Sequence, residues 1–128
     1  MEAIFIKSEG EYLQATIEID GVELHAMDDF GGENCTAGEK IEIDISAGLF
    51  YEDEEWESIF SGNLEQKMGI EHLIGWSYRV YGRVIDITPE VIVDAGAIKL
   101  EVPIDTHDPK VVGEFVAFTI TRLDAYAR

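Results

Sequence analysis

The chain has 128 residues and carries 27 acidic against nine basic side chains, a net charge of −18. The length suits one domain, residues 1–128, around one core, and a hydrophobic content of 46% argues against disorder. The negative charge repels phosphate groups, so we expect no direct binding to nucleic acid or membrane. A single cysteine, Cys35, and an N-terminus without a signal-peptide pattern lead us to expect a cytoplasmic protein.

The first fifty residues alternate between apolar and polar side chains, as half-buried strands do. We expect a short strand in "AIFIK", a hairpin in "ATIEIDGVELHA" (15–26) and another strand in "KIEIDIS" (40–46). Asp20-Gly21 favours a two-residue type I′ turn, because both positions need a positive φ. That turn pairs Ile19 with Val22 and sets Glu18 opposite Glu23. The segment between the hairpin and residue 40 is glycine-rich and is expected to be a loop.

Residues 51–61 predict the main helix of the domain. Leu49, Trp56 and Phe60 fall at helical spacing, and acidic residues crowd the first turn, where the helix dipole favours them. Gly62-Asn63 supplies the stop. Residues 64–74 are interrupted by Gly69 and are expected to form a loop with one further helical turn at most.

Strand patterns resume after residue 75. We expect a long strand at 76–87, in which Gly82 marks a bend or bulge, and strands at 90–96 and 97–103 around a tight turn at Asp94-Ala95-Gly96. A loop at 105–113 precedes the last strand, 114–126. We expect Val116, Phe118 and Ile120 to point into the core.

About seven short strands with one helix near the middle predict a mainly β fold, a closed or partly open antiparallel β-barrel. In its order of elements, over most of the chain, it resembles the OB-fold. OB-folds that bind nucleic acid present a basic groove with stacking aromatic residues. The first strands of this chain present acidic residues instead, so the resemblance implies the fold and not that activity.

The acidic residues are concentrated in one half of the chain. Residues 1–60 have a net charge of −15, whereas residues 61–128 have −3. Alternation points several carboxylates outward, and a dense acidic stretch follows, so we expect a partner-binding surface made of Glu18, Glu23, Glu42, Asp44, Glu52, Asp53, Glu54, Glu55 and Glu57.

No metal, cofactor or catalytic site stands out. The acidic residues of "YEDEEWES" are contiguous and lack the spacing of a Ca²⁺ loop, and His25, Cys35, His72 and His107 lack the spacing of a zinc site. His107 lies between Asp105 and Asp108, as a general base can, but no activated nucleophile accompanies it. Acidic surroundings are expected to raise the pKa of Cys35.

A small cationic and aromatic strip is the remaining candidate. Arg79, Tyr81 and Arg83 alternate on the long strand, where they could bind an anion, mediate self-association or pair with the excess acid.

These observations support three functions. The first is a small acidic module that binds a basic protein, as toxin-neutralising immunity proteins and nucleic-acid-mimic inhibitors do. The second is a structural or self-associating barrel whose acidity serves solubility. The third is a small-molecule-binding barrel or an enzyme with a pocket at the barrel mouth. We expect the first, and we expect no cofactor.

Overall fold

Nine strands and three short 3₁₀ helices make up the described part of the computed structural model, which covers residues 1–50, 55, 57–103 and 106–127. The strands are β1 (Glu2–Ser8), β2 (Gln14–Ile19), β3 (Val22–Asp29), β4 (Lys40–Phe50), β5 (Gly69–Ile74), β6 (Ser77–Asp86), β7 (Val91–Asp94), β8 (Lys99–Val102) and β9 (Phe115–Ala127). The 3₁₀ helices are η1 (Gly32–Asn34), η2 (Ser58–Phe60) and η3 (Pro109–Val111). No helix among these residues is long and apolar enough to cross a membrane.

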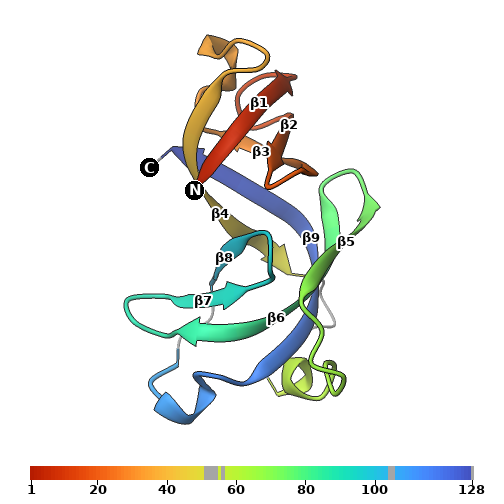
Figure 1. Ribbon diagram of the computed structural model, residues 1–128, viewed down its shortest axis with the longest axis vertical. Coiled ribbons are helices and arrows are strands. Elements are labelled where there is room, and N and C mark those ends of the chain that lie inside the picture. The colour runs from red at the N-terminus through yellow and green to blue at the C-terminus, as the bar shows by residue number, and fades with distance from the viewer. Residues whose placement is uncertain (51–54, 56, 104–105, 128) are drawn as a thin grey trace.

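The strands form one sheet whose hydrogen bonds close two barrel-like rings. β1, β2, β3, β9 and β4 form the first ring, which the pairing of β1 with β4 closes. β9, β4, β8, β7 and β6 form the second ring, which the pairing of β9 with β6 closes. Figure 1 shows the first ring in the upper half of the molecule and the second in the lower half, with β9 running through both. β4 and β9 therefore belong to both rings.

A bulge in β9 reverses which of its side chains face the core where the strand passes from one ring to the other. Leu49 lies opposite Arg122 and Phe50 lies opposite Ile120, which leaves Thr121 as an extra residue. An extra residue reverses which side chains face the core. The large buried residues of β9 accordingly change from even to odd positions, from Val116, Phe118 and Ile120 to Leu123 and Ala125.

The buried apolar side chains form one continuous core through both rings. The largest fully buried ones come from β2, β3, β4, β6, β8 and β9 and include Ile17, Leu24, Ile45, Tyr78, Leu100 and Phe118. The expected inward residues of the last strand are thus confirmed. Gly48 on β4 has a specific steric role, because a β-carbon there would overlap the carboxylate of Asp124. Arg122 holds that carboxylate with two hydrogen bonds of 2.6 and 3.0 Å.

The predicted hairpin is confirmed in its turn and its register. Asp20 and Gly21 have φ values of 53° and 79°, as a type I′ turn requires. Ile19 pairs with Val22, and Glu18 pairs with Glu23. The tight turn between β7 and β8 is also found, with Gly96 at a φ of 94° and the Ala95 N–H donating to the Ile98 carbonyl.

The predicted central helix is wrong. β4 extends to Phe50, and the described residues of the 51–61 segment contain only the single 3₁₀ turn η2. Leu49, which was expected to start the buried helical stripe, lies on β4 with half of its surface exposed. Trp56, the expected core anchor, lies outside the described residues. An OB-like barrel with one helix is therefore not the fold of this chain.

The all-antiparallel arrangement is wrong as well, because β3 pairs with β9 and β4 pairs with β8 in parallel. Residues 64–74 were expected to form a loop with a helical turn, but they contain β5, which pairs with β6. Gly82, which was expected to mark a bend or bulge, is a point of close approach, since a β-carbon there would lie 2.5 Å from the carbonyl oxygen of Asp94 on β7. The register irregularity of β6 lies between Val84 and Asp86.

Candidate functional site

The strand register gathers outward carboxylates of the first ring into one surface, the acidic face, made of Glu2, Glu18, Glu23, Glu42 and Asp44. Glu18 lies directly opposite Glu23, and Glu2 lies directly opposite Glu42. Ile4 lies opposite Glu18, so Glu2 and Glu18 are diagonal neighbours, which corresponds to about 7–8 Å between their backbones. The four glutamates therefore form a band across β4, β1, β2 and β3.

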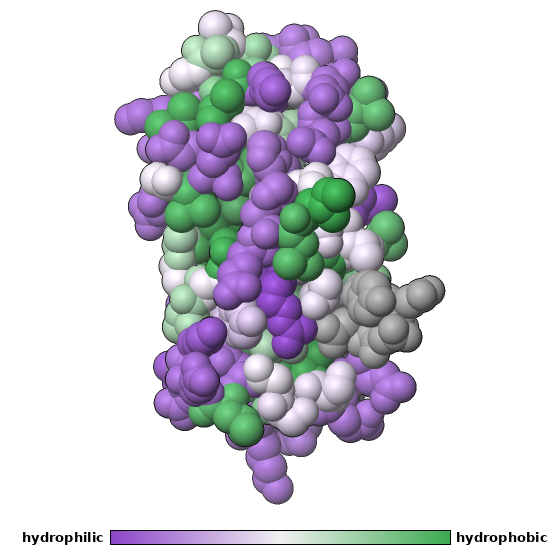
Figure 2. Space-filling model, turned by 90° about the vertical axis from the view of Figure 1, so that its right-hand side faces the viewer, coloured by the Kyte–Doolittle hydropathy of each residue, from purple (hydrophilic) through white to green (hydrophobic). Residues whose placement is uncertain are grey.

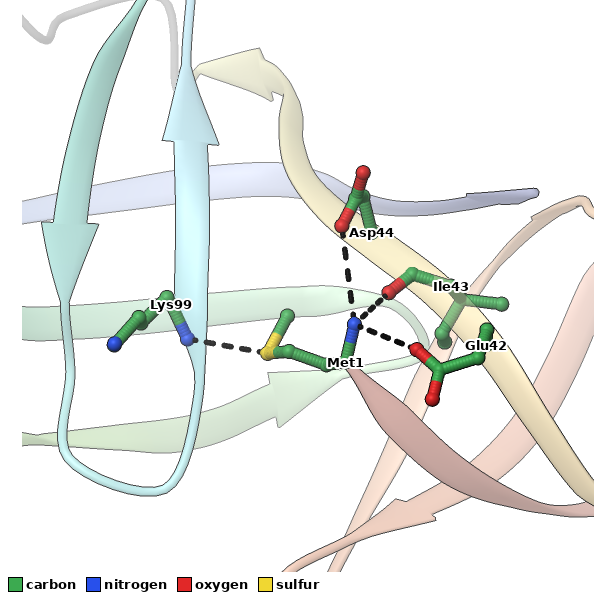
Figure 3. A network of polar contacts seen from close by, with 5 residues as sticks. All are labelled: Met1, Glu42, Ile43, Asp44 and Lys99. Carbon is green, nitrogen blue, oxygen red and sulfur yellow. Dashed lines mark hydrogen bonds and ion pairs between the residues drawn. The ribbon is translucent and has the colours of Figure 1, made fainter. Parts of the chain in front are cut away.

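Two cationic groups lie at one end of this band. The N-terminal amine of Met1 donates to the carbonyl of Ile43 at 2.6 Å and lies 3.5 Å from Glu42 and 3.9 Å from Asp44 (Figure 3). Lys40 lies 4.0 Å from Glu2. Exposed ion pairs of this kind contribute about 0–1 kcal/mol. Within the described part of the chain, neither Glu18 nor Glu23 makes an ion pair, so the negative charge is least compensated on β2 and β3.

Carboxyl groups also crowd the junction of the two rings. Asp44 lies opposite Tyr126, and Glu101 on β8 lies opposite Ser46 on the neighbouring β4. Burial raises the pKa of Glu101, the hydrogen bond from the Tyr126 hydroxyl lowers it, and the Glu90 carboxyl and the Asp44 charge raise it. Burial and the carboxyl groups of Glu101, Asp44 and Glu90 raise the pKa of Tyr126. Acidic character therefore continues from the first ring onto β8.

A cleft of about 360 Å³ opens beside this junction and is lined in part by Asp44, Ile92, Lys99 and Glu101. Figure 3 shows the Met1 side chain between β4 and β8, where its sulfur accepts a hydrogen bond of 3.5 Å from the Lys99 backbone N–H. The cleft holds groups of both signs. The cleft is therefore less uniform in charge than the pair Glu18 and Glu23, which makes no ion pair among the described residues.

The acidic stretch that follows β4 is only partly described. Glu52, Asp53 and Glu54 lie outside the described residues, whereas Glu55 and Glu57 are described and exposed. β4 carries Glu42 near its start and ends at Phe50. At about 3.3 Å per residue, the path along the strand between these two positions is about 26 Å. We therefore base the candidate surface on the acidic face.

The cationic strip on β6 is occupied by contacts of its own. The Lys67 ammonium lies 5.0 Å and the Arg79 guanidinium 5.5 Å from the centre of the Tyr81 ring. Arg79 also donates to the Thr119 hydroxyl at 3.0 Å, while Arg83 is exposed. These contacts favour the interpretation that Arg79 is held within the fold.

The structure brings two of the three histidines together. The rings of His25 and His72 lie 5.2 Å apart, and His72 lies 5.1 Å from the Tyr78 ring. His107 is exposed on the loop before η3. Among the described residues, no three His, Cys, Asp or Glu side chains are placed to hold a metal ion. Burial, Glu39 and Asp28 raise the pKa of Cys35, which agrees with the expected acidic surroundings.

Two residues of this region were not among the sequence candidates. Glu2 alternates with the inward Ala3 and Phe5, and Glu101 alternates with the buried Leu100 and Val102. That alternation marks both glutamates as facing away from the core. Their neighbours, however, come from the β1–β4 and β4–β8 pairings, which join segments far apart in the sequence.

In comparisons with protein-family models, curated proteins and solved structures, no match to this chain was found.

Proposed function

We propose that this protein is an acidic binding module whose acidic face docks onto a basic protein surface. The partner is a protein rich in lysine and arginine, of the kind that a toxin-neutralising immunity protein or a nucleic-acid-mimic inhibitor blocks. The single cysteine suits a reducing cytoplasm as the setting.

The observation that carries the proposal is the pairing of like charges in the sheet. Glu18 and Glu23 are direct cross-strand neighbours without an ion pair among the described residues, and like charges in that position reduce stability. Glu2 and Glu42 are paired in the same way but lie beside Lys40 and the N-terminal amine. Solubility needs negative charge, but it does not need carboxylates placed opposite each other. A cationic partner would be attracted by both carboxylates of such a pair and would offset the repulsion between them, which supports binding as the reason for the arrangement.

Electrostatic attraction determines how such a complex behaves. Complementary surface charges speed association and fix the orientation of the partners, and their effect falls as salt screens them. The partner should therefore associate fast at low salt, and most of the loss at higher salt should appear in the association rate.

The test compares two variants of equal net charge. One carries Glu18→Gln, Glu23→Gln and Glu42→Gln on the acidic face. The control carries Glu33→Gln, Glu65→Gln and Glu114→Gln at exposed positions elsewhere. Association with basic proteins captured at low salt, and with the product of a neighbouring gene, is measured by biolayer interferometry from 20 to 500 mM NaCl.

We expect the acidic-face variant to bind about tenfold more weakly at low salt, which corresponds to about 0.5 kcal/mol for each of three charges. The control should lose much less, and poly-L-lysine, which senses net charge, should not separate the two variants. Equal losses in both variants would contradict the proposal and favour the interpretation that the acidity serves solubility.

A further inference from the structure

β5 has an open hydrogen-bonding edge. Among the described strands, the other eight each pair with at least two neighbours, whereas β5 pairs only with β6. Within the part of the chain that the structure describes, the backbone N–H and carbonyl groups on the outer side of β5 therefore have no strand partner. Such an edge is a ready template for another strand, and proteins commonly shield it with proline, bulges or a covering segment.

β5 carries few of these protections. It contains no proline, and its one bulge, at Leu73, lies near the end of the strand. Leu73 and Ile74 are 51% and 78% exposed. Figure 2, which views the molecule from the side on which β5 lies in Figure 1, shows an apolar group near the centre of this face with hydrophilic side chains next to it. An apolar cluster with a polar surround is typical of an interaction site.

The β5–β6 hairpin is held in place against the first ring. His72 packs against His25 of β3, and the Tyr78 hydroxyl of β6 accepts a hydrogen bond of 2.8 Å from the His25 backbone N–H. Gly75 in the hairpin turn lies close to the Gln14 side chain. The open edge is therefore fixed beside β3, two residues along from Glu23 of the acidic face.

Charge complementarity selects the occupant. A second copy of this chain would bring another net charge of −18 to the edge, and the nearby Glu23 and Glu71 would repel it. An extended segment with alternating lysine and apolar residues fits better. Its backbone would pair with β5 and its apolar side chains would cover the face of Leu73. Its lysines would lie on the opposite face, the face of His72, toward Glu23.

We propose that β5 accepts an extended segment of the basic partner as an added strand, an inference that rests on the proposed function. The test uses the full chain labelled with ¹⁵N and an eight-residue peptide that alternates lysine with valine. A second peptide has the same sequence with alternate backbone nitrogens methylated. The methyl groups remove the N–H donors along one edge of the peptide and keep every charge.

We expect the first peptide to shift the amide resonances of residues 69–74 and to slow their hydrogen exchange about tenfold, and the methylated peptide to bind about tenfold more weakly. Leu73→Ser should weaken binding, whereas Ile85→Ser, at another exposed apolar position, should not. An alternating glutamate–valine peptide should not bind.

Equal binding of the two lysine peptides, or shifts confined to the acidic face, would overturn strand addition and leave the proposed function standing. Pairing of two copies through β5, detected by sedimentation, would overturn the choice of occupant. If β5 responds but the acidic-face variant binds the peptide as the wild type does, strand addition stands and the acidic face fails.

Discussion

The paired glutamates of the acidic face should lower the stability of the protein, and Glu18→Gln measures this directly. Like charges directly opposite each other in a sheet cost about 0.2–1 kcal/mol. Glu18 lies opposite Glu23 and makes no ion pair within the described residues. We therefore expect Glu18→Gln to raise the free energy of unfolding by about 0.2–1 kcal/mol.

This gain is measurable as a shift in melting temperature. An unfolding entropy of about 2.1 cal/mol/K per residue gives about 0.27 kcal/mol/K for 128 residues. The expected gain is then about 1–4 °C, followed by circular dichroism at 10 mM NaCl. At 1 M NaCl the screening length falls to about 3 Å, and most of the gain should disappear.

A double-mutant cycle separates the pair from the general effect of net charge. Glu23→Gln should give the same gain as Glu18→Gln, and the double variant should gain little beyond either single one, because the repulsion is removed once. Glu114→Gln, which changes the net charge equally, should add independently to each. Fully additive gains for Glu18→Gln and Glu23→Gln, or no gain at all, would refute the cross-strand repulsion.

Three further predictions concern the fold and its titration. Tyr78→Phe removes the acceptor of the His25 N–H, and thermal melts should show a loss of about 1–3 kcal/mol, the cost of an unsatisfied polar group. Gly48→Ala forces the Asp124 carboxylate away and should cost about 1–3 kcal/mol in urea unfolding, whereas Gly69→Ala, which has open space around it, should cost less. Because the folded-state pKa of Glu101 is raised, its contribution to stability is complete below the ordinary glutamate pKa and is lost as the pH rises through the raised value. The stability of Glu101→Gln relative to wild type should therefore increase between pH 4.5 and pH 8, and a flat difference would contradict the assignment.

The local pattern of the sequence predicts the parts of the fold that one turn determines. The turn and register of the hairpin around Asp20-Gly21 were predicted correctly, because the turn needs two positive φ values and alternation then sets every pair. The same alternation placed Glu18, Glu23, Glu42 and Asp44 away from the core. The outward orientation of these candidate residues was thus predictable from the residues alone.

The closure of the rings was not predictable in this way. The parallel pairing of β3 with β9 and of β4 with β8 joins segments that lie far apart along the chain, and no local signal specifies such pairs. β5 was missed for another reason. Its last four residues are exposed on both faces, so they lack the two-residue alternation that burial on one face imposes.

The false helix arose from a coincidence of spacing. Leu49 and Phe60 fit a helical stripe in the sequence, but Leu49 belongs to β4 and Phe60 to η2. Acidic residues are also typical of the first turn of a helix, because the helix dipole favours negative charge there. The acidic run after residue 50 therefore resembled a helix start. The charge pattern alone therefore could not exclude a helix after residue 50.

The sharing of β4 and β9 makes the closure of both rings depend on the last strand of the chain. Neither ring can close before residues 115–127 are in place, so a shortened chain lacking them would leave Ile17, Leu24 and Ile45 without their cover. Contacts between such distant segments slow folding, because loop entropy is lost before the contacts form. Both rings, and with them the surfaces that they carry, are therefore complete only once the last strand is inserted.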